Sequence, residues 1–285
     1  MIKALAARLR QGHRTMRFPA APPPPMPAKY RGLPAIDGTG CAKQGSASCS
    51  ACLESCPVGA LSFAREGPGA GGGAPAPSLD LGSCIFCGAC AEACPAGAIE
   101  FGGDHRLAVR RREDLLLVPG SEGLSLATAL EGRIRRLLGR SLKLREVSAG
   151  GCNACEADVN VLGTVGWDLG RFGIQFVASP RHADGLLLTG PVTANMELAL
   201  RKTWDAIPGP KVAIAVGACA ISGGIYAKGE GADFQTRGGG EGIIPVDLFI
   251  PGCPPHPLTI LDGLLRLVGR MERRGDLPAG RKTGK

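Results

Sequence analysis

A repeated arrangement of cysteines constrains the fold of this chain more than any other feature. The segment SCSACLESCPVGALSF (48–63) aligns without gaps with FCGACAEACPAGAIEF (86–101). A repeat in register over sixteen positions indicates that one supersecondary unit has been duplicated. The corresponding cysteines are Cys49 and Cys87, Cys52 and Cys90, and Cys56 and Cys94. Together with Cys41 and Cys84, the two copies contain eight of the twelve cysteines of the 285-residue chain.

The second copy has the cysteine spacing of a bacterial ferredoxin. From Cys84 to Pro95 the chain reads C-x2-C-x2-C-x3-C-P. In that pattern three thiolates of one tight loop bind a 4Fe–4S cluster, and the fourth cysteine binds the other cluster of the pair. The repeat therefore predicts two clusters. The expected ligands are Cys41, Cys49, Cys52 and Cys94 for the first cluster, and Cys84, Cys87, Cys90 and Cys56 for the second.

One ligand of the first copy departs from this spacing. Seven residues separate Cys41 from Cys49, and the position that matches Cys84 is Ser46. We expect the intervening AKQGSAS segment to bulge outward and return, so that Cys41 keeps its role. Paired C-x2-C motifs also bind zinc. Zinc, however, does not account for two C-x2-C-x3-C-P runs in register, and the pattern favours iron–sulfur clusters.

The remaining four cysteines lie in a part of the chain with an α/β pattern. Short apolar runs at 142–147, 173–177, 184–190, 211–216 and 246–252 predict buried strands, and 195–207 and 258–274 predict amphipathic helices. Such alternation indicates a mostly parallel sheet covered on both faces. The carboxyl ends of parallel strands share one edge. The cysteines follow three of these strands, which predicts a third cluster on Cys152, Cys155, Cys219 and Cys253. Buried core thiols are the alternative.

Several motifs resemble those of known families. AGGCNACE, DLGRFG, SPRHADGLLLTGPVT, GACAISGGIY and IPVDLFIPGCPPHP, all within 142–268, resemble the small subunit of group 4 membrane-bound nickel–iron hydrogenases. They are also similar to the B-type subunit of respiratory complex I. Residues 30–114 resemble the polyferredoxin subunit of the same assemblies, so the chain resembles a fusion of two subunits of a formate-hydrogenlyase-type complex. The resemblance implies an α/β fold: a flavodoxin-like parallel-sheet small-subunit domain, preceded by a bacterial 2×(4Fe–4S) ferredoxin-like α+β domain.

The resemblance also implies a function. It is that of an electron-transfer subunit of an oxidoreductase complex, which relays electrons between a ferredoxin-like or other soluble donor and a nickel–iron centre in a partner large subunit. Glu156 would then serve proton movement towards that centre, the alternative being a solvated or capping glutamate. A complex I-like assembly that reduces quinone or pumps ions without hydrogen chemistry is the nearest alternative. The spacing Cys152-x2-Cys155 favours the hydrogenase branch, because complex I subunits of this type use adjacent cysteines. A redox or iron sensor would need a recognition element, which the sequence does not show.

Basic charge is concentrated at the two ends of the chain. Residues 1–36 carry seven basic and no acidic side chains, and the total net charge is +8. Basic ends suit an anionic lipid surface or an acidic partner better than nucleic acid. With no apolar run long enough to cross a bilayer and no signal peptide, we expect a cytoplasmic protein, held at the membrane by membrane subunits. Residues 2–17 predict a short basic amphipathic helix. The expected organisation is a basic amphipathic and proline-rich segment (1–36), a ferredoxin domain (37–112), a linker (113–141), an α/β domain (142–274) and a basic tail (275–285).

Overall fold

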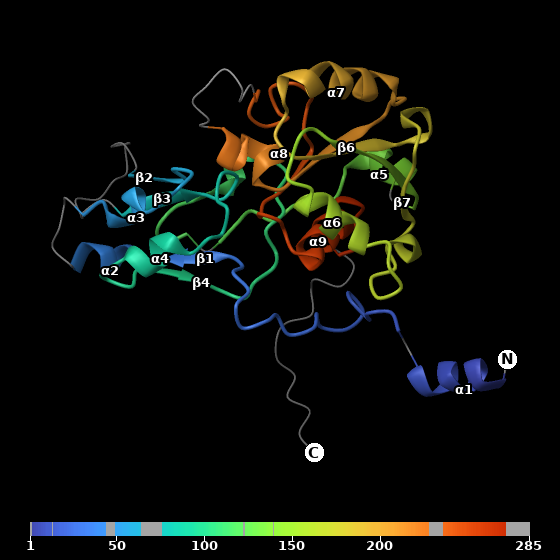
Figure 1. Ribbon diagram of the computed structural model, residues 1–285, viewed down its shortest axis with the longest axis horizontal. Coiled ribbons are helices and arrows are strands. Elements are labelled where there is room, and N and C mark those ends of the chain that lie inside the picture. Colours follow the sequence, from blue (N-terminus) through green and yellow to red (C-terminus); the bar gives the residue numbers. More distant parts are fainter. Residues whose placement is uncertain are drawn as a thin grey trace.

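The fold consists of a five-stranded parallel sheet with helices on both faces and, beside it, a smaller module of two antiparallel sheets (Figure 1). The computed structural model describes residues 2–12, 14–43, 49–63, 76–121, 123–138, 140–227 and 236–271. Within these ranges no helix combines the length and the apolarity that crossing a bilayer requires.

The parallel sheet has the strand order β10-β9-β8-β6-β7. Counted along the chain from β6, this is the 2-1-3-4-5 order of flavodoxin-like folds. Each predicted strand is present, although most are shorter than the apolar run that predicted them. The strands are β6 (Leu142–Ser148), β7 (Ile174–Phe176), β8 (Gly185–Thr189), β9 (Val212–Val216) and β10 (Leu248–Ile250). The helices of this part are α5 (Gly132–Leu138), α6 (Ala154–Val161), α7 (Ala194–Ala206), α8 (Ala218–Ser222) and α9 (Pro257–Leu267).

Alternate residues of the buried strands supply two separate cores, because successive side chains of a strand point to opposite faces. Leu187 and Ile214 belong to the core that contains α9. Leu186 and Leu188 belong to the other core, with Leu200 of α7. Figure 1 shows α7 on one side of the sheet and α6 and α9 on the other. All five residues of β8 and of β9 are buried, as the continuous apolar runs predict.

The smaller module shows the sequence duplication as a duplicated structure. In each copy a short helix bearing one cysteine leads, through a Cys-Pro step, to a three-residue strand. The first copy contains α3 (Ala51–Glu54) and β2 (Leu61–Phe63), and the second contains α4 (Ala89–Ala93) and β4 (Ile99–Phe101). β4 pairs with β1 (Pro34–Ile36), while β2 pairs with β3 (Pro77–Asp80), which pairs with β5 (Leu116–Leu117).

The two parts share one continuous core. Leu79 and Leu115 of the smaller module lie in the same buried cluster as Leu186 of the parallel sheet. Val109 exchanges two backbone hydrogen bonds with Phe249 of β10, at 3.0 and 2.9 Å. The chain leaving the ferredoxin-like module therefore pairs with the exposed edge of the parallel sheet, which holds the two parts together.

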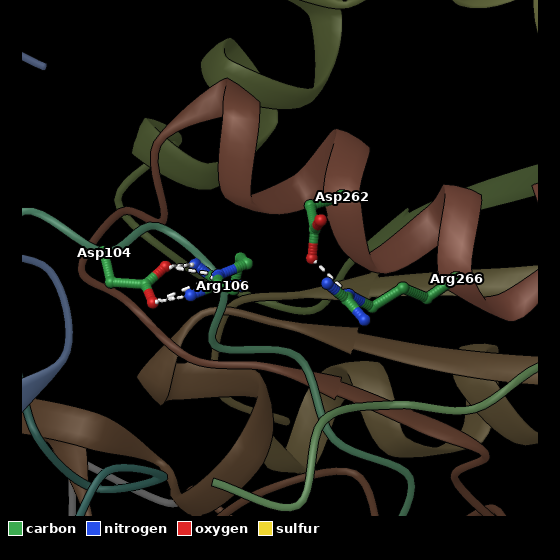
Figure 2. A network of polar contacts seen from close by, with 4 residues as sticks. All are labelled: Asp104, Arg106, Asp262 and Arg266. Atoms are coloured by element: carbon green, nitrogen blue, oxygen red, sulfur yellow. Dashed lines mark hydrogen bonds and ion pairs between the residues drawn. The ribbon is translucent and has the colours of Figure 1, made fainter. Parts of the chain in front are cut away.

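A cavity of about 620 Å³ lies where α9 faces the segment that leaves β4. Arg106 makes a bidentate contact with Asp104, and Arg266 donates from Nε to Asp262 Oδ2 at 2.7 Å (Figure 2). Both pairs line the cavity together with His105. Asp262 is fully buried, so the cation of Arg266 is needed to offset the loss of its hydration.

Two helices end earlier than predicted, and Cys41 lies in an element that was not predicted. The predicted basic helix is α1 (Ile2–Gln11), which ends well before residue 17, and α9 ends at Leu267 rather than near 274. Cys41 lies in the short helix α2 (Gly38–Lys43), whereas a bulging loop was expected to begin there. Positions 44–48 of that loop lie outside the described residues.

Candidate metal centres

The four cysteines expected to hold the first cluster lie around one pocket. Cys41, Cys49, Cys52 and Cys94 line it together with apolar side chains such as Ile36 and Phe63. Burial raises the pKa of the Cys41 thiol, and the nearby Cys94 and Cys49 raise that pKa further. Burial likewise raises the pKa of Cys52, with Cys94 the next contributor. Four thiols that line one largely apolar pocket form a ready set of donors for a cationic metal centre.

The four cysteines expected to hold the second cluster also lie close to one another. Burial raises the pKa of Cys84 to about 12, with contributions from the other three thiols, Cys90, Cys56 and Cys87. Burial also raises the pKa of Cys90 to about 11, with contributions from Cys56, Cys87 and Cys52. Since Cys52 belongs to the first group, the two groups are neighbours through Cys52 and Cys90.

Backbone N–H groups already point at several of these sulfur atoms. The amide of Ala60 donates to Cys56 Sγ at 3.2 Å, and the amide of Ala98, its counterpart in the repeat, donates to Cys94 Sγ at 3.3 Å. Phe86 N donates to Cys84 Sγ at 3.3 Å. Such bonds stabilise negative charge on sulfur, and a thiolate that binds iron carries this charge. The residues present in both copies therefore fit an iron–sulfur cluster.

The last four cysteines meet at the carboxyl edge of the parallel sheet. Cys152 follows β6, Cys155 lies at the start of α6, Cys219 lies in α8 directly after β9, and Cys253 follows β10. Burial raises the pKa of Cys219 to about 11, and Cys253 and Cys152 contribute next. The pKa of Cys155 is raised by burial and by Cys219. The structure thus brings together four thiols, of which the first and the last are more than one hundred residues apart in the sequence.

Two glycines leave room for the sulfur atoms of this third group. A Cβ atom at Gly217, where φ is +90°, would lie 2.5 Å from Cys155 Sγ. A Cβ atom at Gly224, where φ is +54°, would lie 2.8 Å from Cys219 Sγ. Only a residue without a side chain fits these positions, both for space and for backbone conformation. The loops therefore form a cradle that fits a bulky group held by thiolates.

The third group lies at the molecular surface. Cys152 and Cys253 are exposed, Cys155 is half-buried and Cys219 is buried. A centre held there would be covered by the chain on one side and open on the other.

Two glutamates lie close together beside the third group. Glu156 is buried, with 7% of its surface exposed, and accepts a hydrogen bond of 2.8 Å from Thr189 Oγ1. It is therefore not the solvated glutamate that was one of the expected alternatives. Burial and the charge of Glu156 raise the pKa of Glu146 to about 7. Glu146 was missed by the sequence reasoning, although an acidic residue inside a predicted buried strand was a visible signal.

A cavity of about 330 Å³ lies between the second and third groups. Ile85 and Phe86 line it from the loop between Cys84 and Cys87, and Cys253 lines it from the parallel sheet. Tyr30 also lines it and contacts the ring of His256 edge-on, with 5.6 Å between ring centroids. His256 caps α9, because its Nδ1 accepts a hydrogen bond from Leu258 N at 3.1 Å.

These features define an iron–sulfur protein in which a duplicated ferredoxin-like module precedes a flavodoxin-like domain. A family model described as NADH ubiquinone oxidoreductase, 20 Kd subunit, matches residues 152–267, and a 4Fe-4S dicluster domain matches residues 47–105. Cys41 lies upstream of the second match. The chain belongs to the family of the 20 kDa subunit of NADH–ubiquinone oxidoreductase, with a 4Fe–4S dicluster domain in front.

Three named relatives each match between 41% and 55% of this chain. Formate hydrogenlyase subunit 7 of Escherichia coli is 39% identical over 157 residues, which are 55% of this chain and 60% of that protein. A probable membrane-bound hydrogenase subunit, mbhJ, of Pyrococcus furiosus is 38% identical over 154 residues, which are 52% of this chain and 90% of that protein. An NADH-quinone oxidoreductase subunit of Desulfovibrio desulfuricans is 38% identical over 117 residues, which are 41% of this chain and 61% of that protein.

Proposed function

We propose that this chain is the electron-transfer subunit of a membrane-bound nickel–iron hydrogenase complex and that it holds three 4Fe–4S clusters. The observation that carries the proposal is the gathering of all twelve cysteines into three groups of four. Bound clusters would supply one-electron transfer, and the catalytic centre would belong to a partner large subunit. The proposed ligands are Cys41, Cys49, Cys52 and Cys94; Cys56, Cys84, Cys87 and Cys90; and Cys152, Cys155, Cys219 and Cys253.

The residues of this chain have four tasks in the proposal. The thiolates hold each centre, and the backbone amides of residues such as Ala60 and Ala98 stabilise negative charge at sulfur. Apolar neighbours such as Phe63 shield the first group from water. Glu156 and Glu146 offer a carboxyl pair beside the third group, suited to hold and pass a proton towards a partner. Each of these properties influences the potential of a cluster or the movement of charge near it.

Clusters rather than zinc ions suit the arrangement of the thiols. Eight of the thiols belong to two C-x2-C-x3-C-P runs in register, or lie just upstream of them. This is the spacing of a bacterial ferredoxin, and paired zinc motifs do not account for it.

Metal analysis tests the cluster count. Anaerobically purified protein should contain about twelve iron and about twelve acid-labile sulfide atoms per chain, since each 4Fe–4S cluster has four cysteine ligands. A value near eight would contradict the three-cluster proposal. Stoichiometric zinc without sulfide would contradict the cluster proposal as a whole.

A complex I-like assembly without hydrogen chemistry is the second candidate function. It is favoured by the similarity to an NADH-quinone oxidoreductase subunit, although the separated pair Cys152 and Cys155 favours the hydrogenase type. The two candidates differ in the large subunit. The hydrogenase function would be supported if the purified complex contained nickel and if hydrogen reduced its clusters. The complex I-like function would be supported if an active, quinone-reducing complex lacked both properties.

Attachment to the cytoplasmic face of the membrane through partner subunits completes the proposal. The named relatives include a membrane-bound hydrogenase subunit. We expect the chain to co-purify with a hydrogenase-type large subunit, with membrane subunits and with a soluble electron carrier or donor subunit. The exposed third group marks the side where the large subunit would dock.

A further inference from the structure

The N-terminal helix α1 contributes nothing to either core of the protein. None of its residues is buried, and Figure 1 shows it projecting away from the rest of the molecule. Ile2, Leu5 and Leu9 are 85%, 64% and 77% exposed. Their spacing places all three on one face of the helix. This face is apolar and has no partner among the described residues.

Cationic side chains lie on both sides of this apolar face. At about 100° per residue, Lys3 and Arg10 lie on one flank and Arg8 lies on the other. The first turn has no acidic residue, and Arg8 and Arg10 lie in the last turn. A narrow apolar face with cations on both sides is typical of helices that lie in the plane of a membrane surface.

The chain that follows α1 is fixed to the folded body. Met16 N donates to the carbonyl of Gly166 at 2.8 Å, and Arg171 Nη2 donates to the carbonyl of Phe18 at 2.8 Å. Phe18 is buried in the core that contains α9. Val165, which lies beside this anchor, is itself 63% exposed. The chain after α1 is therefore anchored at a defined place on the body, beside an exposed apolar side chain.

We propose that α1 binds directly to an anionic phospholipid surface. Ile2, Leu5 and Leu9 would enter the boundary between headgroups and acyl chains, and the flanking cations would contact lipid phosphates. A bilayer surrounds an inserted helix with phosphates on both sides, which matches the cations on both flanks. The inference does not depend on the redox function. It adds a direct lipid contact to the proposed attachment through partner subunits.

Vesicle flotation of the full-length, cluster-loaded chain tests the proposal. We expect binding to vesicles made of equal parts phosphatidylcholine and phosphatidylglycerol, weak binding to pure phosphatidylcholine, and loss of binding at high salt. Leu9→Asp should weaken binding about tenfold, because it removes an apolar side chain that would enter the lipid and puts a negative charge in its place. Lys3→Glu should weaken it about fivefold or more on the anionic vesicles.

Control substitutions on α7 match these changes in chemistry. Leu198 is 61% exposed, and Figure 1 places α7 far from α1. Leu198→Asp and Lys202→Glu should leave vesicle binding unchanged. Since α1 makes no core contacts, every variant should keep the iron content and circular dichroism of the parent chain.

Three results would overturn the lipid proposal. The first is the absence of binding to anionic vesicles, and the second is equal binding by Leu9→Asp and the parent chain. The third is that Leu9→Asp binds vesicles normally but no longer co-purifies with membrane subunits, which would make α1 a protein-docking helix instead. None of these results would affect the cluster count, so the electron-transfer proposal can stand or fall separately.

Discussion

Single glycines decide whether the sheet edge has room for a cluster. Of the two glycines that face a sulfur atom of the third group, Gly217 has less room, with a hypothetical Cβ atom 2.5 Å from Cys155 Sγ and a φ of +90°. We predict that Gly217→Ala displaces the Cys155 thiol and lowers the iron content by about four atoms per chain, the content of one cluster. Iron analysis combined with electron paramagnetic resonance (EPR) of the reduced protein measures this loss.

Gly242→Ala is the matched control for this glycine. Gly242 has no atom within 4 Å of its hypothetical Cβ, and its φ is not in the left-handed region. This variant should keep the full iron content. Retention of all three EPR signals by Gly217→Ala would show that the loop can shift without losing the ligand.

The carboxyl pair beside the third group makes stability depend on pH. The pKa of Glu146 is raised from 4.5 to about 7, first by burial and then by Glu156. Between these two values the folded state binds more protons than the unfolded state, so stability falls as the pH rises. We predict that Glu146→Gln, which stays neutral, raises the apparent melting temperature at about pH 8 and changes it little at about pH 5.

Thermal unfolding of the anaerobic protein measures this pH dependence. Glu241→Gln is the control, because Glu241 is exposed in the described part of the chain. A Glu146→Gln variant that was equally stabilised at both pH values would contradict the assignment of the raised pKa to this residue.

The residue types at the three groups were predictable, but the neighbours that support them were not. The cysteine spacing indicated the sets of four, because a fixed cluster demands a fixed pattern of ligands. Their assignment as ligands stays a prediction. Glu146 was overlooked because its proximity to Glu156 depends on how β6 packs beside α6. His256, three residues after Cys253, caps α9, a contact that the sequence pattern did not indicate.

At the scale of elements, α9 depends on one buried ion pair. Asp262 is fully buried, and Oδ1 has no hydrogen-bond partner among the described residues, so Arg266 supplies the main compensation for its charge. We predict that Arg266→Leu destabilises the protein by about 3 kcal/mol, because a carboxylate remains buried without its cation. Replacing both residues by leucine should recover much of this loss. Guanidinium unfolding under anaerobic conditions measures the difference.

A surface pair on α7 provides the comparison for this experiment. Arg201 contacts Glu197 at 3.1 Å, but the arginine side chain is 47% exposed. Arg201→Leu should cost less than about 1 kcal/mol, as exposed pairs usually do. If Arg266→Leu cost no more than Arg201→Leu, the buried pair would not be a major support of α9.

Buried strands were easier to predict than the ends of helices. β8 and β9 appear inside the predicted ranges, because continuous apolar runs leave few other positions for a strand. The pattern did not fix the end of α9, since the apolar periodicity continues past Leu267, where the helix stops. It also missed that Cys41 lies in a helix, because Gly38 and Gly40 are typical of a loop. The domain limits at 112–113 and 141–142 remain a prediction.

At the scale of the whole molecule, the three groups of thiols lie in a linear order. Cys52 of the first group contributes to the raised pKa of Cys90 in the second, so these two groups are adjacent. The loop between Cys84 and Cys87 of the second group and Cys253 of the third line one cavity, so these two groups also lie on either side of a shared space. The first group opens on a separate pocket, lined by Ile36 and Pro77. In the proposed function, electrons would therefore pass through the second cluster to reach the third.

This order predicts different consequences for the loss of each ferredoxin-type cluster. Cys41→Ala and Cys87→Ala should each lower the iron content to about eight atoms per chain. In Cys41→Ala the second and third clusters remain neighbours, so the magnetic interaction between them should persist in the EPR spectrum of the fully reduced protein. In Cys87→Ala the intermediate cluster is absent, and the third cluster should give an uncoupled signal and accept electrons slowly from the first. Coupling lost in Cys41→Ala but kept in Cys87→Ala would reverse the order, and would place the first group next to the sheet edge instead.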